Sequence, residues 1–138
     1  MGFLNKLFSK ETNFPELDRS SDVARTVDNF RRELEGLAQE VDDPLEVIPA
    51  SDTVYVFIGK PPRKFGIAWI KDGRVHNFKT LAQEEGVHEM KLMMMSEQIR
   101  KAYEKNSEAP RYSTTVADQK VVVTQSEPLA KELKEIIH

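Results

Sequence analysis

The residue types that do metal or acid–base chemistry are present in this chain, but their spacing does not fit a site. His88 and Glu89 begin like the helical motif of zinc proteases, yet Leu92 occupies the position of the second imidazole. That motif needs two imidazoles one helical turn apart on one face. His76 and His138 lie far from His88 in the sequence and show no ligand spacing. We therefore expect no metal, no cofactor and no catalytic residues.

Nucleophile and phosphate-loop chemistry is not encoded either. Gly59 and Lys60 match the end of a phosphate-binding loop, but the upstream glycine is missing and Pro61 replaces the hydroxyl residue. The chain has no cysteine, which excludes disulfides, zinc thiolates and thiol nucleophiles. Glu84 and Glu85 are adjacent, so on a helix their carboxylates point in different directions and make a poor acid–base pair. These patterns indicate a protein that is not an enzyme.

One charged loop could bind a ligand. Residues 59–64 join two predicted strands and hold three cations together with two prolines, and such a loop could meet a phosphate or an acidic partner. The alternative is a rigid, solvated hairpin loop whose charges discourage aggregation. A nucleic-acid surface would need more basic excess and interleaved aromatic residues; with a net charge of −3, we expect no nucleic-acid partner. The candidate anion-binding residues are Lys60, Arg63, Lys64 and Arg74.

The stretch 53–78 must position this loop, and it predicts strands at 53–58, 65–70 and 74–78. Asp72-Gly73 suits a tight primed turn, so the second and third strands should form a hairpin. Apolar side chains point from both faces of the first two strands. If all helices pack on one face, the other face exposes aromatic residues and marks an interface. Alternatively, the first helix covers that second face and leaves a monomer. The candidate partner-binding residues on the sheet are Tyr55, Phe57, Phe65, Ile67 and Trp69.

Hydrophobic periodicity predicts the remaining elements, which are a helix over about 22–41, a helix over about 87–105, strands at 112–116 and 120–124, and a last helix that begins after Ser126. Four of the five methionines lie on the helix over 87–105. Methionine side chains adapt to varied partners, so Met93 and Met94 join the candidate partner-binding residues. The alternative is ordinary core filling, which is the usual role of a methionine stripe at helical spacing.

The length of 138 residues fits one domain, which we place at 22–138 after an N-terminal segment at 1–21. The start of this segment is either a membrane-surface or partner-docking helix or a short turn that packs on the core or frays. The longest mostly apolar run, at 54–58, is too short to cross a bilayer. We expect a cytoplasmic protein without an integral membrane segment. The apolar residues at the start of the segment are Phe3, Leu4, Leu7 and Phe8, with Lys6 and Lys10 among them.

The predicted order of helix, three strands, helix, two strands and helix indicates an α+β fold, a two-layer sandwich with a five-stranded antiparallel sheet. Over about 22–138 this order resembles the type III secretion chaperone-like fold. Members of that family are small, acidic, cytosolic and commonly homodimeric, and its secretion chaperones bind an extended segment of a partner protein without enzymatic activity. The resemblance implies a homodimer that binds a protein partner along apolar surface. The basic region at 60–79 is not part of that chaperone pattern.

The sequence thus predicts a non-enzymatic protein-interaction domain, chaperone- or adaptor-like, that binds a partner polypeptide through apolar sheet or helix surface. The alternative is a regulatory domain that senses a small anion or nucleotide with the basic hairpin loop. A third hypothesis is an enzyme whose site residues are dispersed along the chain, which a polar cleft with clustered carboxylates and His76 would support.

Overall fold

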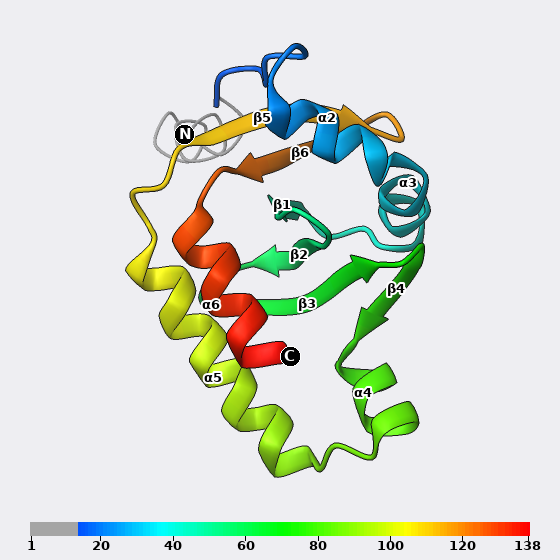
Figure 1. Ribbon diagram of the computed structural model, residues 1–138, viewed down its shortest axis with the longest axis vertical. Helices are drawn as coiled ribbons and strands as arrows, with labels where there is room; N and C mark the ends of the chain where they lie inside the picture. The colour runs from blue at the N-terminus through cyan, green and yellow to red at the C-terminus, as the bar shows by residue number, and fades with distance from the viewer. Residues whose placement is uncertain (1–13) are drawn as a thin grey trace, which may run out of the picture.

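Five helices and six strands follow one another along residues 14–138, the part of the chain that the computed structural model describes. Figure 1 shows their arrangement, with the chain coloured from blue at the N-terminal end to red at the C-terminal end. The elements are α2 (Asp22–Asn29), α3 (Arg31–Glu40), β1 (Leu45–Pro49), β2 (Val54–Lys60), β3 (Lys64–Lys71), β4 (Arg74–Asn77), α4 (Phe78–Glu85), α5 (Glu89–Lys105), β5 (Arg111–Val116), β6 (Gln119–Thr124) and α6 (Glu127–Ile137).

The strands form one mixed sheet in the order β4-β3-β2-β1-β6-β5. The expectation of a five-stranded antiparallel sheet is wrong, because residues 45–49 form a sixth strand and β1 pairs in parallel with β6. The sequence predicts no strand over this stretch, in which Pro49 and the charged Glu46 interrupt the apolar residues. β1 pairs with β2 on its other side, from Leu45 opposite Ile58 to Pro49 opposite Val54. It therefore joins strands β2 to β4 to the β5–β6 pair in one sheet.

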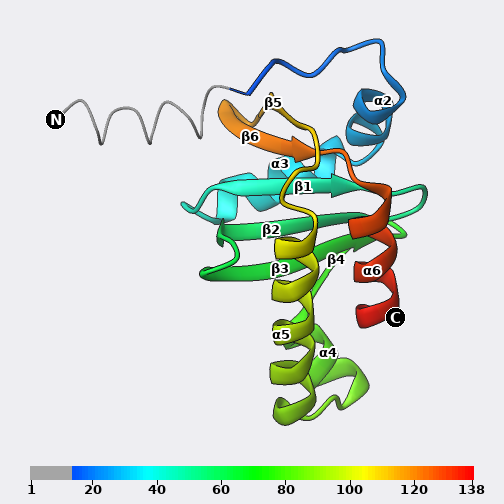
Figure 2. The ribbon, with the colours of Figure 1, turned by 90° about the vertical axis from the view of Figure 1, so that its left-hand side faces the viewer.

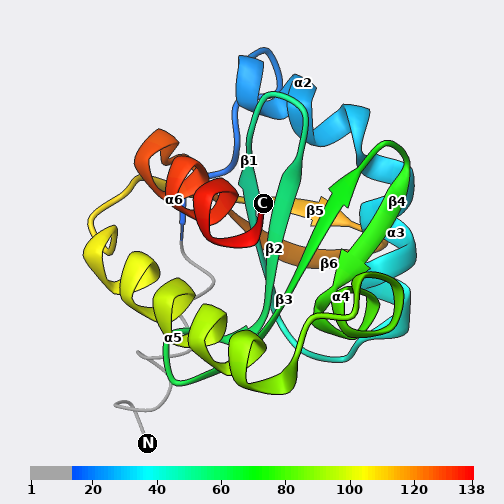
Figure 3. The same cartoon turned by 60° about the horizontal axis from the view of Figure 1, so that its bottom comes forward.

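Helices cover both faces of this sheet, so the predicted two-layer arrangement is also wrong. Figure 2 shows α5 and α6 crossing one face and α3 lying behind the other, and Figure 3 shows α4 beside β4. The predicted helix over 22–41 ends at Asn29 and restarts at Arg31, and both halves pack on the same side. The first core, under α2 and α3, includes Val27, Leu34, Val47, Val56, Ile70 and Val123. The second, under α5 and α6, includes Phe57, Trp69, Met95, Ile99, Leu129 and Leu133.

The apolar sheet residues that we proposed as a partner-binding surface mostly lie in the second core. Tyr55 is 1% exposed, Phe57 is 0%, Ile67 is 6% and Trp69 is 3%. Burial raises the pKa of the Tyr55 phenol to about 12, with a smaller contribution from the negative charge of Asp52. The prediction of an exposed aromatic face is therefore wrong. The alternative in which the first helical region covers the second face is the arrangement observed. α2 and α3 cover one face of the sheet, and α5 and α6 cover the face that carries the aromatic residues.

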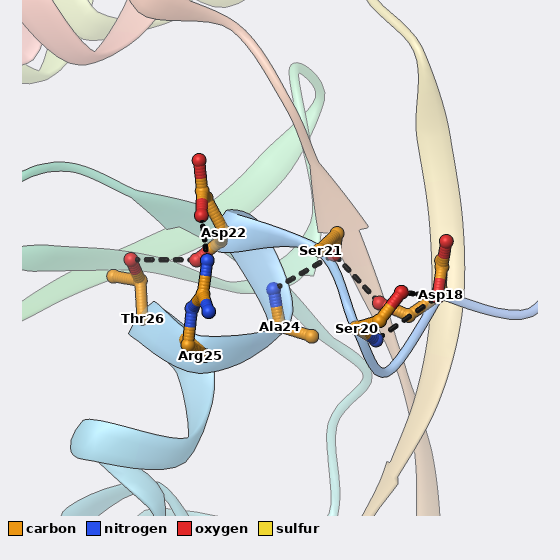
Figure 4. Close-up of polar contacts among 7 residues, drawn as sticks. All are labelled: Asp18, Ser20, Ser21, Asp22, Ala24, Arg25 and Thr26. Atoms are coloured by element: carbon orange, nitrogen blue, oxygen red, sulfur yellow. Dashed lines mark hydrogen bonds and ion pairs between the residues drawn. The ribbon is translucent and has the colours of Figure 1, made fainter.

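The start of α2 is fixed by a local network of side-chain hydrogen bonds (Figure 4). The Ser21 hydroxyl accepts a hydrogen bond from the Ala24 N–H at 3.1 Å and donates one to the Asp18 carbonyl at 2.6 Å. The Asp18 carboxylate accepts from the hydroxyl and the N–H of Ser20, and these bonds lower its pKa. A serine cap of this kind satisfies one of the free N–H groups at the helix start. The network fixes the direction from which residues 14–18 approach the start of the helix.

Residues 14–17 attach to the free edge of the sheet before this cap. The Ser113 N–H of β5 donates to the Pro15 carbonyl at 2.9 Å, and the Leu17 N–H donates to the Ser113 carbonyl at 2.8 Å. The Ser113 hydroxyl donates to the Phe14 carbonyl at 3.1 Å. The chain is therefore tied to β5 from Phe14 onward. The predicted docking helix or turn at the start of the N-terminal segment lies outside the described residues.

The hairpin between β2 and β3 depends on Gly59. Its φ is +115°, and a Cβ atom there would lie 2.8 Å from the Lys64 carbonyl oxygen. We expect Gly59→Ala to lower the free energy of unfolding by about 1–3 kcal/mol, because a non-glycine residue would occupy a sparsely populated backbone region. The measurement is urea unfolding followed by the fluorescence of Trp69, the only tryptophan.

Gly36 provides the matched control for this substitution. It lies within α3, and an added Cβ would meet nothing within 4 Å. Gly36→Ala is expected to raise the free energy of unfolding by about 0.5–1 kcal/mol, because alanine loses less backbone entropy in a helix. Equal effects of the two substitutions would contradict the strained hairpin geometry at Gly59.

Candidate functional site

The predicted anion-binding residues do not all come together. Lys60 and Lys64 are opposite each other across the β2–β3 hairpin, and the Arg63 N–H donates to the Lys60 carbonyl. Arg74 on β4 lies opposite Lys71 in the backbone register, at the other end of β3. The length of an eight-residue strand places it about 25 Å from Lys64. Arg74 also forms an ion pair with Glu84 at 3.3 Å. The structure therefore groups three of the four cations, and the anion-sensing hypothesis stays a prediction.

The first half of α5 carries an exposed apolar surface. Met90, Met93 and Met94 are 76%, 66% and 62% exposed, and they are the only exposed large hydrophobic residues in the described part of the chain. Met95, by contrast, is 5% exposed and belongs to the core. Successive residues turn by about 100° around a helix, so Met95 can face the core while Met94 faces away from it. Figure 2 shows the first turns of α5 extending past β3 toward α4. Two of the predicted partner-binding residues, Met93 and Met94, are thus on the surface.

A groove of about 200 Å³ lies between α5 and β3 next to this surface. Its apolar lining comes from Phe65 and Ile67 on β3, Phe78 at the start of α4, and Leu92 and Met93 on α5. Phe65 is half-buried and touches the ring of Phe57 edge-on, with 5.3 Å between ring centroids. Phe65 is therefore the one predicted aromatic sheet residue that reaches the surface. We call Met90, Met93, Met94 and this groove the α5 surface.

A larger cavity of about 440 Å³ lies at the end of the sheet where β1 and β6 begin. No sequence signal predicted it, because its walls come from segments far apart in the chain. Its apolar lining comes from Phe14, Pro44, Leu45, Pro61, Val121 and Val122. Its charged lining comes from Asp42, Asp43, Glu46, Lys60, Arg111 and Lys120. We call it the β1–β6 cavity.

A buried ionic cluster forms one wall of this cavity. The Glu46 carboxylate on β1 accepts hydrogen bonds from the Tyr103 hydroxyl at 2.7 Å, from the Arg111 guanidinium at 3.3 Å and from the Thr124 hydroxyl. The side chains of Arg111 and Glu46 are 13% and 11% exposed. Arg111 also donates to the Ser107 carbonyl at 2.8 Å. The cluster links β1, β5, β6 and α5.

The Tyr103 phenol and the Arg111 guanidinium both keep their protons in this cluster, which favours a structural role. Burial, reinforced by the negative charge of Glu46, raises the pKa of the Tyr103 phenol, which keeps it protonated as a donor. Burial works against the charged form of Arg111, but Glu46 and Tyr103 outweigh it and raise the pKa of Arg111. Both oxygens of the Glu46 carboxylate are occupied by donors. Because three donors from three different elements converge on the Glu46 carboxylate, the cluster holds these elements together. Sequence reasoning missed it because no element was predicted over residues 45–49, where Glu46 lies.

The histidines do not form a site. His76 stacks on Trp69 with 6.0 Å between ring centroids, and His138 contacts the same ring edge-on. Burial, followed by the positive charge of Lys71, lowers the pKa of His138. Among residues 14–138 there is no group of three or more acidic or histidine side chains that could hold a metal ion. Within the same residues, no helix combines the length and apolar character needed to cross a membrane.

The comparisons with known proteins leave the function to be argued from these surfaces. No family model, curated protein or solved structure matches this chain. The observed order of elements also differs from the predicted order on which we based the resemblance to type III secretion chaperones. The two features left to interpret are the α5 surface and the β1–β6 cavity.

Proposed function

We propose that this protein is an interaction domain rather than an enzyme, and that it binds an amphipathic segment of a partner polypeptide on the α5 surface. The observation that carries the proposal is the exposure of Met90, Met93 and Met94 beside an apolar groove. This is the chaperone- or adaptor-like role that the sequence predicts on sheet or helix surface, and we assign it to the helix surface. The sheet cannot serve, because Phe57 and Trp69 are buried within one subunit.

The physical argument rests on what three exposed methionines do on one helix. Large apolar side chains gathered on the surface of a small protein mark an interaction site more often than they arise without a role. Methionine is unbranched and polarizable, so its side chain adapts to the shape of a bound segment. A groove beside a helix receives an amphipathic helix through apolar residues three and four positions apart. The α5 surface offers both features in one place.

Charge around the α5 surface suggests the chemistry of the partner. Glu89 is exposed and lines the groove beside Met93, and it forms no ion pair within residues 14–138. Lys91 is the single cation in the stretch 84–97. A segment with apolar anchors and flanking lysine or arginine residues would meet complementary charge here. We therefore infer a basic, amphipathic partner segment, in a reducing compartment such as the cytoplasm that a chain without cysteine suits.

Site-specific crosslinking can test this proposal, because the chain has no cysteine of its own. A benzophenone attached at Met93→Cys in the full chain should capture a partner from the native cell extract. The same label at Gln39→Cys, which is exposed on α3 on the other face of the sheet, should not capture it. A partner captured equally from both positions would contradict the proposal. Capture of a second copy of this chain would instead show that the α5 surface is the contact of a homodimer.

The affinity for the captured partner gives the quantitative prediction. Burial of one methionine side chain contributes about 1.5–3 kcal/mol, so Met93→Asp with Met94→Asp should weaken binding by at least about tenfold. The free energy of unfolding should stay unchanged, because both side chains are mostly exposed. Isothermal titration calorimetry checks the affinity, and urea unfolding checks the fold. Unchanged affinity in a folded double variant would exclude the α5 surface as the binding site.

A further inference from the structure

We propose that the β1–β6 cavity is the binding site of this chain's own residues 1–13, which dock into it within the same molecule through their apolar side chains. This site is separate from the α5 surface, and the inference does not depend on the function proposed above. It gives the cavity an occupant whose chemistry is encoded in the sequence. It also explains why the cavity lies where residues 1–13 join the described chain.

The first argument is the position at which the described chain begins. Phe14 itself lines the cavity, and the Ser113 hydroxyl and N–H donate to the Phe14 and Pro15 carbonyls at 3.1 and 2.9 Å. The thirteen preceding residues therefore start from a fixed point at the cavity wall. A segment tethered beside its site meets that site at a high effective concentration, so even weak apolar contacts suffice for docking.

The second argument is the match between the two chemistries. The cavity is lined by proline, leucine and valine side chains, and its exposed charged groups are the carboxylates of Asp42 and Asp43 together with the ammonium groups of Lys60 and Lys120. Residues 1–13 bring four large apolar side chains at helical spacing with two lysines among them. Apolar side chains in the cavity would lose contact with water, and Lys6 and Lys10 would meet the two carboxylates. The apolar residues are Phe3, Leu4, Leu7 and Phe8.

The third argument is reach, which separates this cavity from the α5 surface. The groove of the α5 surface lies against β3, and the sheet order places β3 four strands from β5. That separation is about 19 Å across the sheet. The six peptide units from Phe8 to Phe14 extend at most about 20 Å, before any path around α5 is counted. Figure 2 shows β1 and β6 beginning on one side of α5, the side from which the described chain starts. The β1–β6 cavity is thus the nearer apolar site.

A paramagnetic label in the full-length protein tests the docking directly. Because the chain has no cysteine, the thiol of Asn5→Cys is the single attachment point for a nitroxide. We expect it to remove the amide NMR signals of the cavity walls, at Asp43, Leu45 and Lys120–Val122, and to do so equally at every protein concentration. The same label combined with Leu4→Asp and Leu7→Asp should restore those signals, because charged side chains would not enter an apolar cavity.

Two other results would overturn the inference. Loss of signal at Met90–Met94 that fades on dilution would place the segment on the α5 surface of a second copy. Uniform, weak loss without preference for the cavity walls would show that the segment does not dock in the cavity. Because the substitutions lie outside the described fold, the amide spectrum of residues 14–138 provides an internal check that each variant is folded.

Discussion

Arg111→Met should lower the free energy of unfolding by about 3–5 kcal/mol, although this residue lies in no recognisable motif. The substitution removes the cation that faces Glu46 and leaves a carboxylate that is 9% exposed with only two hydroxyl donors. A buried charge without its counter-charge is far more costly than a broken surface pair. It would also remove the guanidinium that holds the Ser107 carbonyl at 2.8 Å. Urea unfolding followed by Trp69 fluorescence measures the loss.

Two variants separate this effect from the general cost of replacing an arginine. Arg100→Met removes a cation that pairs with Glu97 and Glu104 on the exposed side of α5, and it should leave the unfolding curve almost unchanged. The double variant of Arg111→Met with Glu46→Met should recover much of the lost stability, because an apolar pair replaces the ionic one. If Arg111→Met lost as little stability as Arg100→Met, water that enters the β1–β6 cavity would be screening the charges of the cluster.

Phe57→Ala is expected to cost about 3–5 kcal/mol of unfolding free energy while the protein keeps its oligomeric state. Phe57 is 0% exposed and contacts the rings of Phe65 and Tyr103 edge-on, with 5.3 and 5.0 Å between ring centroids. Truncating it would leave a cavity between the sheet and α5 that the helix can fill only in part. The substitution therefore tests whether α5 and α6 of the same molecule cover this face.

The matched control lies on the other face of the same sheet. Ile70 is also 0% exposed, but it belongs to the core under α2 and α3. Ile70→Ala should cost about 2–5 kcal/mol, which would show that both faces are interior. Light scattering on the two variants and the unchanged protein completes the test. If Phe57→Ala cost less than 1 kcal/mol and dissociated a dimer, the aromatic face would be an interface and our account of the fold would be wrong.

The sequence by itself determined the elements whose signals are local. The turn at Asp72-Gly73 predicted the β3–β4 hairpin, and apolar periodicity predicted a helix close to Glu89–Lys105. The last helix begins directly after Ser126, as predicted, and Ser126 caps it by accepting a hydrogen bond from the Leu129 N–H. Each of these signals involves residues within one turn or one hairpin, where propensity and hydrogen bonding act directly. The α+β class followed from them and is confirmed.

Tertiary structure alone decided how these elements combine. β1 exists as a strand because β2 and β6 supply partners for its backbone, and β6 lies more than seventy residues away in the chain. The Glu46 cluster needs the same long-range pairing, since Tyr103, Arg111 and Thr124 come from three other elements. Which helices cover each face of the sheet is likewise a property of the assembled fold. Local periodicity reports that a side chain is apolar, whereas the element that covers it is set by packing between distant segments. That is why Met93 ended on the surface and Phe57 in the core.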